Sequence, residues 1–310
     1  MSYLICGEAL FDCFLDSGAD ADALRLDLRM GGSPFNVAIG IARLGGQAAL
    51  LGGISTDMLG ERLVRALESE RVSTDYLVRT GRRTTLSLVG VDPGGQPSYS
   101  FYGVGSADRH VTAEAVSPPG PEIQGLHFGS YSMVVTPVAD TFVALAASAG
   151  GRFVSIDPNV RPTVEPDLDI WRSRLTEFAR AASVLKISSE DLETLYPDAD
   201  PESWAATWID RGVRLVVVTD GGDAISAWTS DGIHVRREPP ATVVVDAVGA
   251  GDSFQAALLA RLAANGDPAV ALAAMTQDDL ESLLDFSARA AAITCSRRGA
   301  NLPRSQEMVR

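Results

Sequence analysis

The sequence predicts an α/β fold with a mostly parallel central sheet and helices on both of its faces. Short apolar runs rich in Val, Ile and Leu alternate along the 310 residues with longer stretches of helical period. The runs are almost continuously apolar, as in strands that are covered on both faces. With 46% hydrophobic and 21% charged residues, the chain has enough apolar material for a large core. The length allows one large domain or two smaller ones, and we predict a single domain over residues 1–310.

The alternation gives a list of expected elements. The expected strands are Tyr3–Cys6, Ala48–Ile54, Gly125–Phe128, Phe153–Asp157, Ser183–Ile187, Leu215–Thr219 and Val243–Asp246. The expected helices are Val37–Leu44, Leu59–Ser69, Pro137–Ala149, Trp171–Ala182 and Pro201–Arg211, and three more between Ala250 and Ser296. Pro34 stands where a helix can begin, and Gly45-Gly46 stand where it would stop.

Two segments interrupt this pattern. Thr84–Val91 and Ser98–Tyr102 are predicted to form a β-hairpin around the turn at residues 92–96. Phe11–Met30 is also predicted to be extended, because it has no clear helical face. Two such excursions can pair into a small sheet beside the main body. That sheet could cover a cleft as a lid or form a contact between two copies of the chain.

The composition excludes several classes of function. With 26 basic and 40 acidic residues the formal net charge is −14, which does not suit a nucleic-acid or anionic-membrane surface. Lys186 is the only lysine and is followed by Ile187, so the chain has no P-loop. Three Cys and three His without a C-x-x-C pair supply neither a disulfide framework nor a zinc site. With no export signal and no apolar stretch near ~20 residues, we expect a cytoplasmic protein.

The strongest chemical signal is the segment Val243–Phe254, where an apolar run leads through Gly249-Ala250-Gly251 into a predicted helix. Unpaired amides at a helix start lie at the positive end of its dipole and form an anion site. Asp252 adds a carboxylate that can accept a proton from a hydroxyl. An anion site beside a general base is the minimum equipment for moving a phosphoryl group onto an alcohol. The alternative is an ordinary glycine-rich turn with Asp252 as a first-turn acid.

A second signal is Gly31-Gly32-Ser33-Pro34-Phe35-Asn36, which precedes a predicted helix. Paired glycines let a backbone approach a ligand closely, and the Asn36 amide can bind neighbouring sugar hydroxyls. Taken alone, the segment is better explained as a glycine-rich loop that ends in a helix cap. Phe101, on the predicted hairpin, could stack on a sugar or pack against a neighbouring strand.

Together and in this order, the two motifs resemble those of the ribokinase-like (PfkB-type) carbohydrate kinases. Their C-terminal motif, Asp-Thr-x-Gly-Ala-Gly-Asp, is similar to Asp246–Asp252 here. Within that family the chain looks most like the bacterial fructokinases, because Asp157–Pro162 is similar to their D-P-N-x-R-P segment. The segments 126–130 and 186–192 also look like theirs. The resemblance covers nearly the whole chain and implies a ribokinase-like fold with a β-sheet lid, formed by residues of about 11–31 and 83–108.

The resemblance also implies an activity and a set of site residues. The activity is ATP-dependent phosphorylation of a free sugar, D-fructose to fructose 6-phosphate. Asp252 would be the catalytic base, and the amides of Gly249, Ala250, Gly251 and Asp252 would bind the transferred phosphate. Expected sugar contacts are Asp12, Gly31, Gly32, Asn36, Phe101 and Arg161, and expected nucleotide contacts are Lys186, Ser188, Thr219, Asp220, Gly221 and Asp223. Mg²⁺ would be held through water by Glu190 and Asp191, K⁺ is a further candidate beside Asp246, and the lid could build a homodimer.

Departures from the family pattern keep alternatives open. Gly103–Gly105 lacks the polar residues that fructokinases often carry there, so 2-keto-3-deoxygluconate, ribose or a nucleoside remain alternative acceptors. An acidic acceptor would need Arg109 or Arg161 in the pocket. A non-catalytic sugar or nucleotide sensor is a second class, although it would not need Asp252. Lys186 is expected either at the ATP phosphates or in a structural ion pair.

Overall fold

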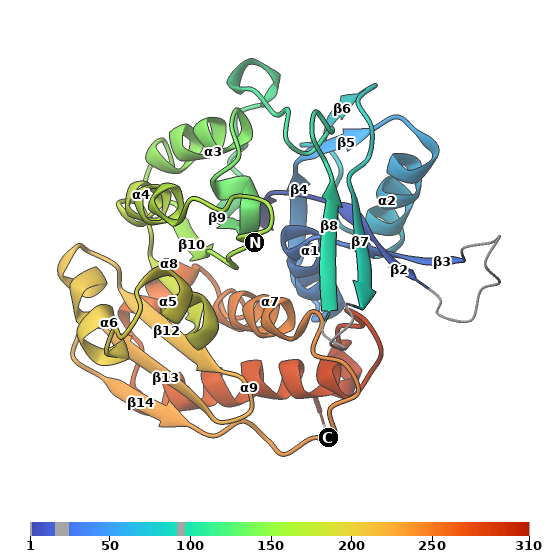
Figure 1. Ribbon diagram of the computed structural model, residues 1–310. Helices are drawn as coiled ribbons and strands as arrows, with labels where there is room; N and C mark the ends of the chain where they lie inside the picture. The colour runs from blue at the N-terminus through green and yellow to red at the C-terminus, as the bar shows by residue number, and fades with distance from the viewer. Residues whose placement is uncertain (1, 16–24, 92–96, 310) are drawn as a thin grey trace.

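An eight-stranded sheet forms the centre of the computed structural model, which describes residues 2–15, 25–91 and 97–309 (Figure 1). The strand order is β14–β13–β12–β11–β10–β9–β1–β4. From β12 to β4 all neighbours are parallel, and β13 and β14 add an antiparallel edge. The bounds are β1 Ser2–Cys6, β4 Gln47–Leu51, β9 Ile123–Gly129, β10 Phe153–Asp157, β11 Val184–Ser188, β12 Leu215–Asp220, β13 Ala224–Thr229 and β14 His234–Arg237.

Helices cover both faces of this sheet. One face carries α1 (Ser33–Arg43), α2 (Met58–Ser69), α7 (Ala250–Leu262), α8 (Pro268–Ala273) and α9 (Gln277–Cys295). The other carries α3 (Val138–Ala147), α4 (Leu168–Ala179), α5 (Ser189–Leu195) and α6 (Pro201–Asp210). Strand residues alternate between the two cores: in β1, Tyr3 and Ile5 pack on the first face, and Leu4 and Cys6 pack on the second. The predicted α/β fold is therefore confirmed.

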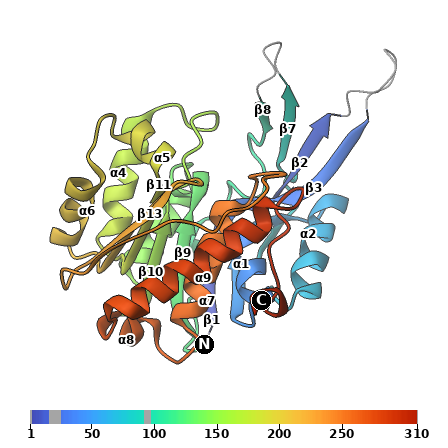
Figure 2. The same cartoon turned by 90° about the horizontal axis from the view of Figure 1, so that it is seen from below.

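The two predicted excursions pair into a separate four-stranded sheet in the order β3–β2–β7–β8, called the lid sheet below. Its strands are β2 (Leu10–Leu15), β3 (Leu26–Gly31), β7 (Leu86–Val91) and β8 (Pro97–Tyr102), and they project away from the main body (Figure 2). Asp12 lies opposite both Arg29 and Ser87, and Ser87 lies opposite Phe101. These four residues therefore form one row across the lid sheet. The predicted turn at 92–96 and residues 16–24 lie outside the described residues.

Two strand predictions are wrong. Val243–Asp246 is irregular backbone, and Val243, Val244 and Val245 are 60–82% exposed. The segment is held instead by the Val245 amide, which donates to the Cys295 carbonyl oxygen at 2.8 Å. The run Ala48–Ile54 breaks at Gly52 into β4 and β5 (Gly53–Ser55), and β5 pairs with β6 (Val78–Thr80). A side chain at Gly52 would lie 2.2 Å from the Gly7 carbonyl oxygen, so the chain bends where only glycine fits.

The helix predictions are confirmed, including the three C-terminal ones. Pro34 lies in the first turn of α1, and Gly45 follows its end with a φ of 90°. Short 3₁₀ turns occur at Ala113–Ala115, Ser130–Met133 and Ser305–Glu307. Over the described part of the chain, no helix is both long and apolar enough to cross a membrane.

Candidate active site

The amino ends of α1 and α7 meet at the centre of the site. A side chain at Gly40 of α1 would lie 2.5 Å from the Cβ of Ala256 in α7, so the two helices pack with their backbones close together. This close approach brings the two sequence motifs into contact. The Asn36 Nδ2 donates a hydrogen bond to the Asp252 Oδ2 at 2.8 Å, although 216 positions separate the two residues.

Backbone geometry at the start of α7 supports an anion site. Gly249 precedes the helix with a φ of 79°, and a side chain there would lie 2.6 Å from the Cβ of Ala300, so only glycine fits. The first-turn amides of Gly251 and Asp252 have no carbonyl partner within the helix. The Ala250 amide, however, donates to the Ala247 carbonyl oxygen at 3.2 Å. Of the predicted phosphate donors, Ala250 is therefore already engaged.

Asp252 has the environment of a proton acceptor. Its side chain is buried, and burial raises its pKa above the ordinary aspartate value. The Ser33 hydroxyl and the Asn36 amide lower the pKa again, and among the charges nearby Asp157 raises it and Arg161 lowers it. The net increase makes the carboxylate a better base than a free aspartate while leaving its bond to Asn36 intact.

The only lysine lies directly beside the predicted anion site. The Lys186 Nζ donates to the Asp157 Oδ2 at 2.8 Å, and both side chains are at least 96% buried, with 4% and 2% exposed. The same nitrogen is 3.3 Å from the position that a Cβ on Gly251 would occupy. Lys186 therefore forms an ion pair and also places its positive charge next to the start of α7. Asp157 was not predicted as a site residue, although its position at the carboxyl end of a buried strand is a signal for one.

Carboxylates gather beside this ion pair, where the nucleotide residues were predicted. The Asp191 Oδ1 accepts the Val160 amide at 3.0 Å, and the Asp191 amide donates to the Ser188 Oγ at 3.0 Å. Burial, followed by the charge of Asp157, raises the pKa of Asp191 to about 6. Glu190 is exposed on α5. The described residues offer no group of three or more side chains that could ligate a metal ion directly. The buried Asp157 Oδ1 lacks a hydrogen-bond partner among them, which fits a Mg²⁺ ion held through water.

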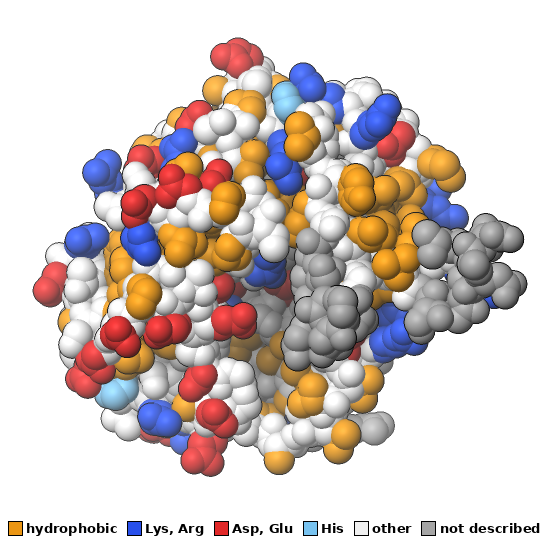
Figure 3. All heavy atoms as spheres, in the orientation of Figure 1, with side chains coloured by type: hydrophobic (Ala, Val, Ile, Leu, Met, Phe, Trp, Pro, Cys, Tyr) orange, Lys and Arg blue, Asp and Glu red, His pale blue; other side chains and the backbone are white. Residues whose placement is uncertain are grey.

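The other predicted nucleotide residues lie at the carboxyl ends of β11 and β12. Thr219 is opposite Ser188 in the sheet, and Asp220 to Asp223 form an exposed turn closed by the Asp223 amide on the Asp220 carbonyl oxygen at 2.8 Å. Gly221 takes a φ of 48° in that turn. Acidic side chains gather over α5 and the β12–β14 edge on the face drawn in Figure 3. A nucleotide there would depend on the α7 amides, Lys186 and a divalent cation for positive charge.

Several residues predicted to bind the sugar lie on or beside the lid sheet. A side chain at Gly31 would lie 2.4 Å from the Asp12 Oδ2, so the bare Gly31 backbone makes room for that carboxylate. Burial raises the pKa of Asp12, and the nearby charges of Arg161 and Asp252 lower and raise it respectively, so Asp12 lies within electrostatic reach of the predicted base. Gly32 has a φ of 104° and lies against the Glu8 carbonyl oxygen. The Phe101 ring packs edge-on against Tyr131 of the Ser130–Met133 turn, with ring centroids 6.2 Å apart, and its contact with a sugar stays a prediction.

A buried polar cluster at the base of the lid sheet was not predicted. The Asp108 carboxylate accepts hydrogen bonds from the hydroxyls of Thr85, Ser106 and Tyr131 at 2.5, 2.6 and 2.8 Å. Glu8 is 1% exposed, and burial raises its pKa to about 7. Arg161 lowers the pKa values of Glu8, Asp12, Asp191 and Asp252 alike. Arg161 therefore lies between the two sides of the site.

Comparison with known proteins identifies the family. The family model described as "pfkB family carbohydrate kinase" matches residues 3–307. The chain belongs to this family. It is 36% identical to a fructokinase of Rhizobium leguminosarum bv. trifolii, over 84% of this chain and 79% of that protein. It is 32% identical to a fructokinase of Salmonella typhimurium, with 96% and 94% covered.

Solved structures agree with this assignment. The fructokinase of Xylella fastidiosa with bound ATP is 29% identical, with a TM-score of 0.91 over 99% of this chain and 97% of that one. A double mutant of the Vibrio cholerae O395 fructokinase, in a fructose-, ADP- and potassium-bound form, is 26% identical with a TM-score of 0.82, and 96% and 93% are covered. The chain is thus a PfkB carbohydrate kinase with a ribokinase-like fold, and membership implies ATP and a divalent cation as its cofactors.

Proposed function

We propose that this kinase transfers the γ-phosphoryl group of ATP to the 6-hydroxyl of D-fructose. The named relatives support fructose, since they are fructokinases of about one-third identity. The observation that carries the proposal is the contact between Asn36 and Asp252. It joins the residue expected to bind sugar hydroxyls to the residue expected to remove a proton from one of them.

The chemistry follows from the positions of these groups. The Asp12 carboxylate would accept hydrogen bonds from sugar hydroxyls, and the Asn36 amide would donate one to the sugar. The Asp252 carboxylate would take the proton of the attacking hydroxyl. The amides of Gly251 and Asp252 would bind the charge that develops on the transferred phosphoryl group. Lys186 would add positive charge there without leaving Asp157. The lid sheet would exclude water, which otherwise competes as an acceptor.

Two cations belong to the proposal. Mg²⁺ bound with ATP would neutralise phosphate charge, with Asp157 and Asp191 holding its water ligands and the exposed Glu190 farther out. For K⁺ the candidate is Asp246, whose Oδ1 accepts the Val248 amide at 3.0 Å and whose Oδ2 accepts the Gly299 amide at 2.8 Å. Each oxygen keeps a second lone pair for a cation. Turnover in K⁺ compared with the same concentration of choline tests this assignment.

The lid sheet also offers a surface for a homodimer. Leu26, Leu28 and Met30 alternate along the edge strand β3 and are 38–46% exposed, so they share one face. We include in the proposal that a second copy of the chain covers this face. Sedimentation velocity of the wild type and of Leu28→Glu tests it, since a charge at the centre of the face should yield monomers.

The acceptor is tested by ATP consumption over a panel of fructose, ribose, 2-keto-3-deoxygluconate and nucleosides, with each product identified by mass spectrometry. We expect the highest kcat/KM with fructose. The guanidinium of Arg109 lies over the Tyr131 ring, 5.3 Å from its centroid, so Arg161 is the arginine that would have to receive an acidic acceptor. Preferred turnover of a sugar acid or nucleoside would overturn the choice of fructose, and no turnover with any acceptor would favour the sensor.

A further inference from the structure

One arginine of the lid sheet lies against the body of the protein. Arg29 is the residue of β3 that stands opposite Asp12, so the two side chains share the face of the lid sheet turned to the site. The Arg29 Nη1 is 2.9 Å from the position of a Cβ on Gly299, and its Cδ is 3.5 Å from the same position. The guanidinium therefore packs on the bare backbone of the turn that follows α9.

That turn is part of the anion site. The Gly299 amide donates to the Asp246 Oδ2 at 2.8 Å, and the Asp246 Oδ1 accepts the Val248 amide at 3.0 Å. Ala300 packs against Gly249, the residue that leads into α7. A displacement of the turn would therefore also displace the loop that carries the amides predicted to bind phosphate.

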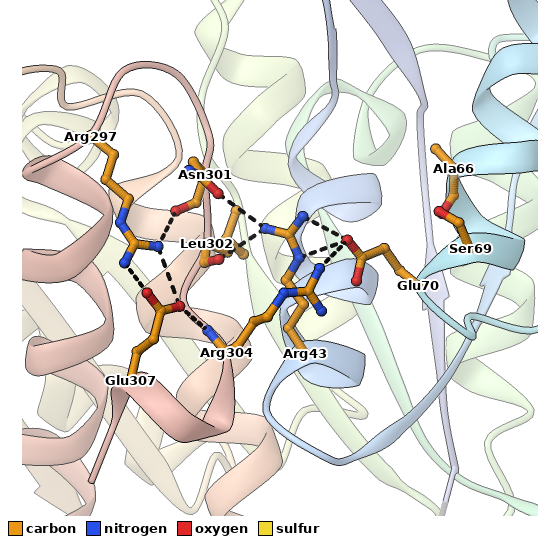
Figure 4. Close-up of polar contacts among 9 residues, drawn as sticks. All are labelled: Arg43, Ala66, Ser69, Glu70, Arg297, Asn301, Leu302, Arg304 and Glu307. Carbon is orange, nitrogen blue, oxygen red and sulfur yellow. Dashed lines mark hydrogen bonds and ion pairs between the residues drawn. The ribbon is translucent and has the colours of Figure 1, made fainter. Parts of the chain in front are cut away.

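The turn is fixed firmly to the body on its other side. Arg43 of α1 donates to the Leu302 carbonyl oxygen at 2.9 Å and to the Glu70 Oε1 at 2.7 Å, and Arg304 donates to the same Glu70 oxygen at 2.8 Å (Figure 4). Arg297 pairs with Glu307 in the same cluster. These groups fix residues 297–307 to the body, so the Arg29 contact joins the lid sheet to a firmly held turn.

Arg29 is itself held in position on the lid sheet. Its Nε and Nη2 donate to the Asp27 Oδ2 at 3.0 and 2.8 Å. Its guanidinium carbon lies 5.7 Å from the centroid of the Phe14 ring. These contacts fix the orientation of the side chain, so Arg29 moves with the lid sheet and not independently of it.

We propose that Arg29 is a positioning residue that couples sugar binding to nucleotide binding. A sugar held by Asp12 would stabilise the contact between the lid sheet and the body. Arg29 would then hold the Gly299 turn in place and, through Asp246, the loop of the anion site. Coupling of this kind is reciprocal, so bound nucleotide would equally tighten the sugar. The inference rests on the proposed function, because it needs both ligands to bind this chain.

Calorimetric titration of Mg²⁺-ADP, with and without saturating fructose, measures the coupling. For the wild type we expect fructose to lower the Kd of ADP by about 5-fold or more. Arg29→Ala should bring this ratio close to one while leaving the Kd of ADP without fructose within about 2-fold. Arg29→Lys should keep a part of the coupling, since an ammonium retains the charge but not the planar contact. The matched control is Arg25→Ala, at an exposed arginine just before the same strand, which should keep the wild-type ratio.

Turnover separates this role from damage to the fold. Arg29→Ala should raise the KM for ATP at saturating fructose more than it lowers kcat, with an unchanged unfolding temperature. If Arg29→Ala keeps the wild-type ratio of the ADP Kd values without and with fructose, this inference alone is overturned. The same holds if the wild type binds the two ligands independently. A wild type that binds ADP but neither binds nor phosphorylates fructose would overturn the proposed function, and with it this coupling.

Discussion

The predicted phosphate side of the site consists of backbone amides at the start of α7 and a buried ion pair, whereas the predicted sugar side consists of side chains on the lid sheet. Asp252 and Lys186 are enclosed between the central sheet and the helices. Asp12 and Phe101 stand on strands that leave the main body (Figure 2). Amides and a fixed cation bind any phosphoryl group, so this side determines the type of reaction and carries little information about the acceptor.

The predicted sugar side differs because its row of side chains is brought together by pairing within the lid sheet. Asp12, Ser87 and Phe101 stand opposite one another on neighbouring strands that lie outside the eight-stranded sheet. Acceptor choice within this architecture is therefore expected to change through the lid sheet. The predictions below separate the two sides, because changes on the phosphate side should reduce kcat and changes on the sugar side should raise the KM of the sugar.

The largest effect is expected for Asp252→Asn. The substituted amide keeps the shape of the side chain but cannot accept the proton, so kcat should fall by about 10²- to 10⁴-fold. Fructose binding, measured by calorimetry, should change far less. Asp278→Asn, at an exposed acid in the first turn of α9, is the matched control and should leave kcat unchanged. Turnover of Asp252→Asn within a few-fold of the wild type would remove Asp252 as the base.

The second largest effect is expected for Lys186→Met. Removing the cation leaves Asp157 charged and buried without its partner, which should lower the free energy of unfolding by about 3–5 kcal/mol in urea titrations. Adding Asp157→Asn should restore part of this stability but not the activity. Lys186→Arg addresses the phosphate contact, since a role at phosphate predicts a higher KM for ATP and an ion pair alone predicts little change. Equal stability of Lys186→Met and the wild type would contradict the importance of the pair.

The difference between the two sides also explains what sequence could predict. The anion loop is a contiguous motif with a physical reason for each small residue. Of the two excursions that form the lid sheet, one has a turn signal and the other has no helical face, so the motif and the lid sheet could be found by pattern. The role of Glu8 could not be found by pattern, and for Asp157 the pattern offered only its position at the end of a buried strand. Their partners, Asp108 and Lys186, come from distant parts of the chain. Val243–Val245 was predicted to be a buried strand because of its apolar residues. Apolar content alone does not show whether other elements cover a segment, and these three side chains are exposed to solvent.

A third prediction uses the proton held at the base of the lid sheet. The pKa of Glu8 is about 7 in the folded protein, above its ordinary value of 4.5. Between these pH values the folded state keeps a proton that the unfolded state has lost, so stability falls as pH rises from about 4.5 to about 7. The loss amounts to about 3 kcal/mol. Glu8→Gln should reduce the pH dependence of stability by this amount in urea titrations, whereas Glu68→Gln, at an exposed residue of α2, should leave the pH dependence of the wild type. A Glu8→Gln variant with the pH dependence of the wild type would show that Glu8 is ionised in the fold.

The smallest effect is expected for Gly31→Ala, which tests the sugar side alone. The new methyl group would lie 2.4 Å from the Asp12 Oδ2, so the carboxylate must turn away from its present position, whereas the phosphate side is left untouched. We expect the KM for fructose to rise roughly 10-fold, the equivalent of about one weakened hydrogen bond, with kcat reduced less than KM is raised. Gly81→Ala, where the added methyl group meets nothing within 4 Å, is the matched control and should behave like the wild type. If Gly31→Ala lowers kcat and leaves the KM of fructose unchanged, Asp12 acts on the chemical step rather than on sugar binding, and the division between the two sides fails at this residue.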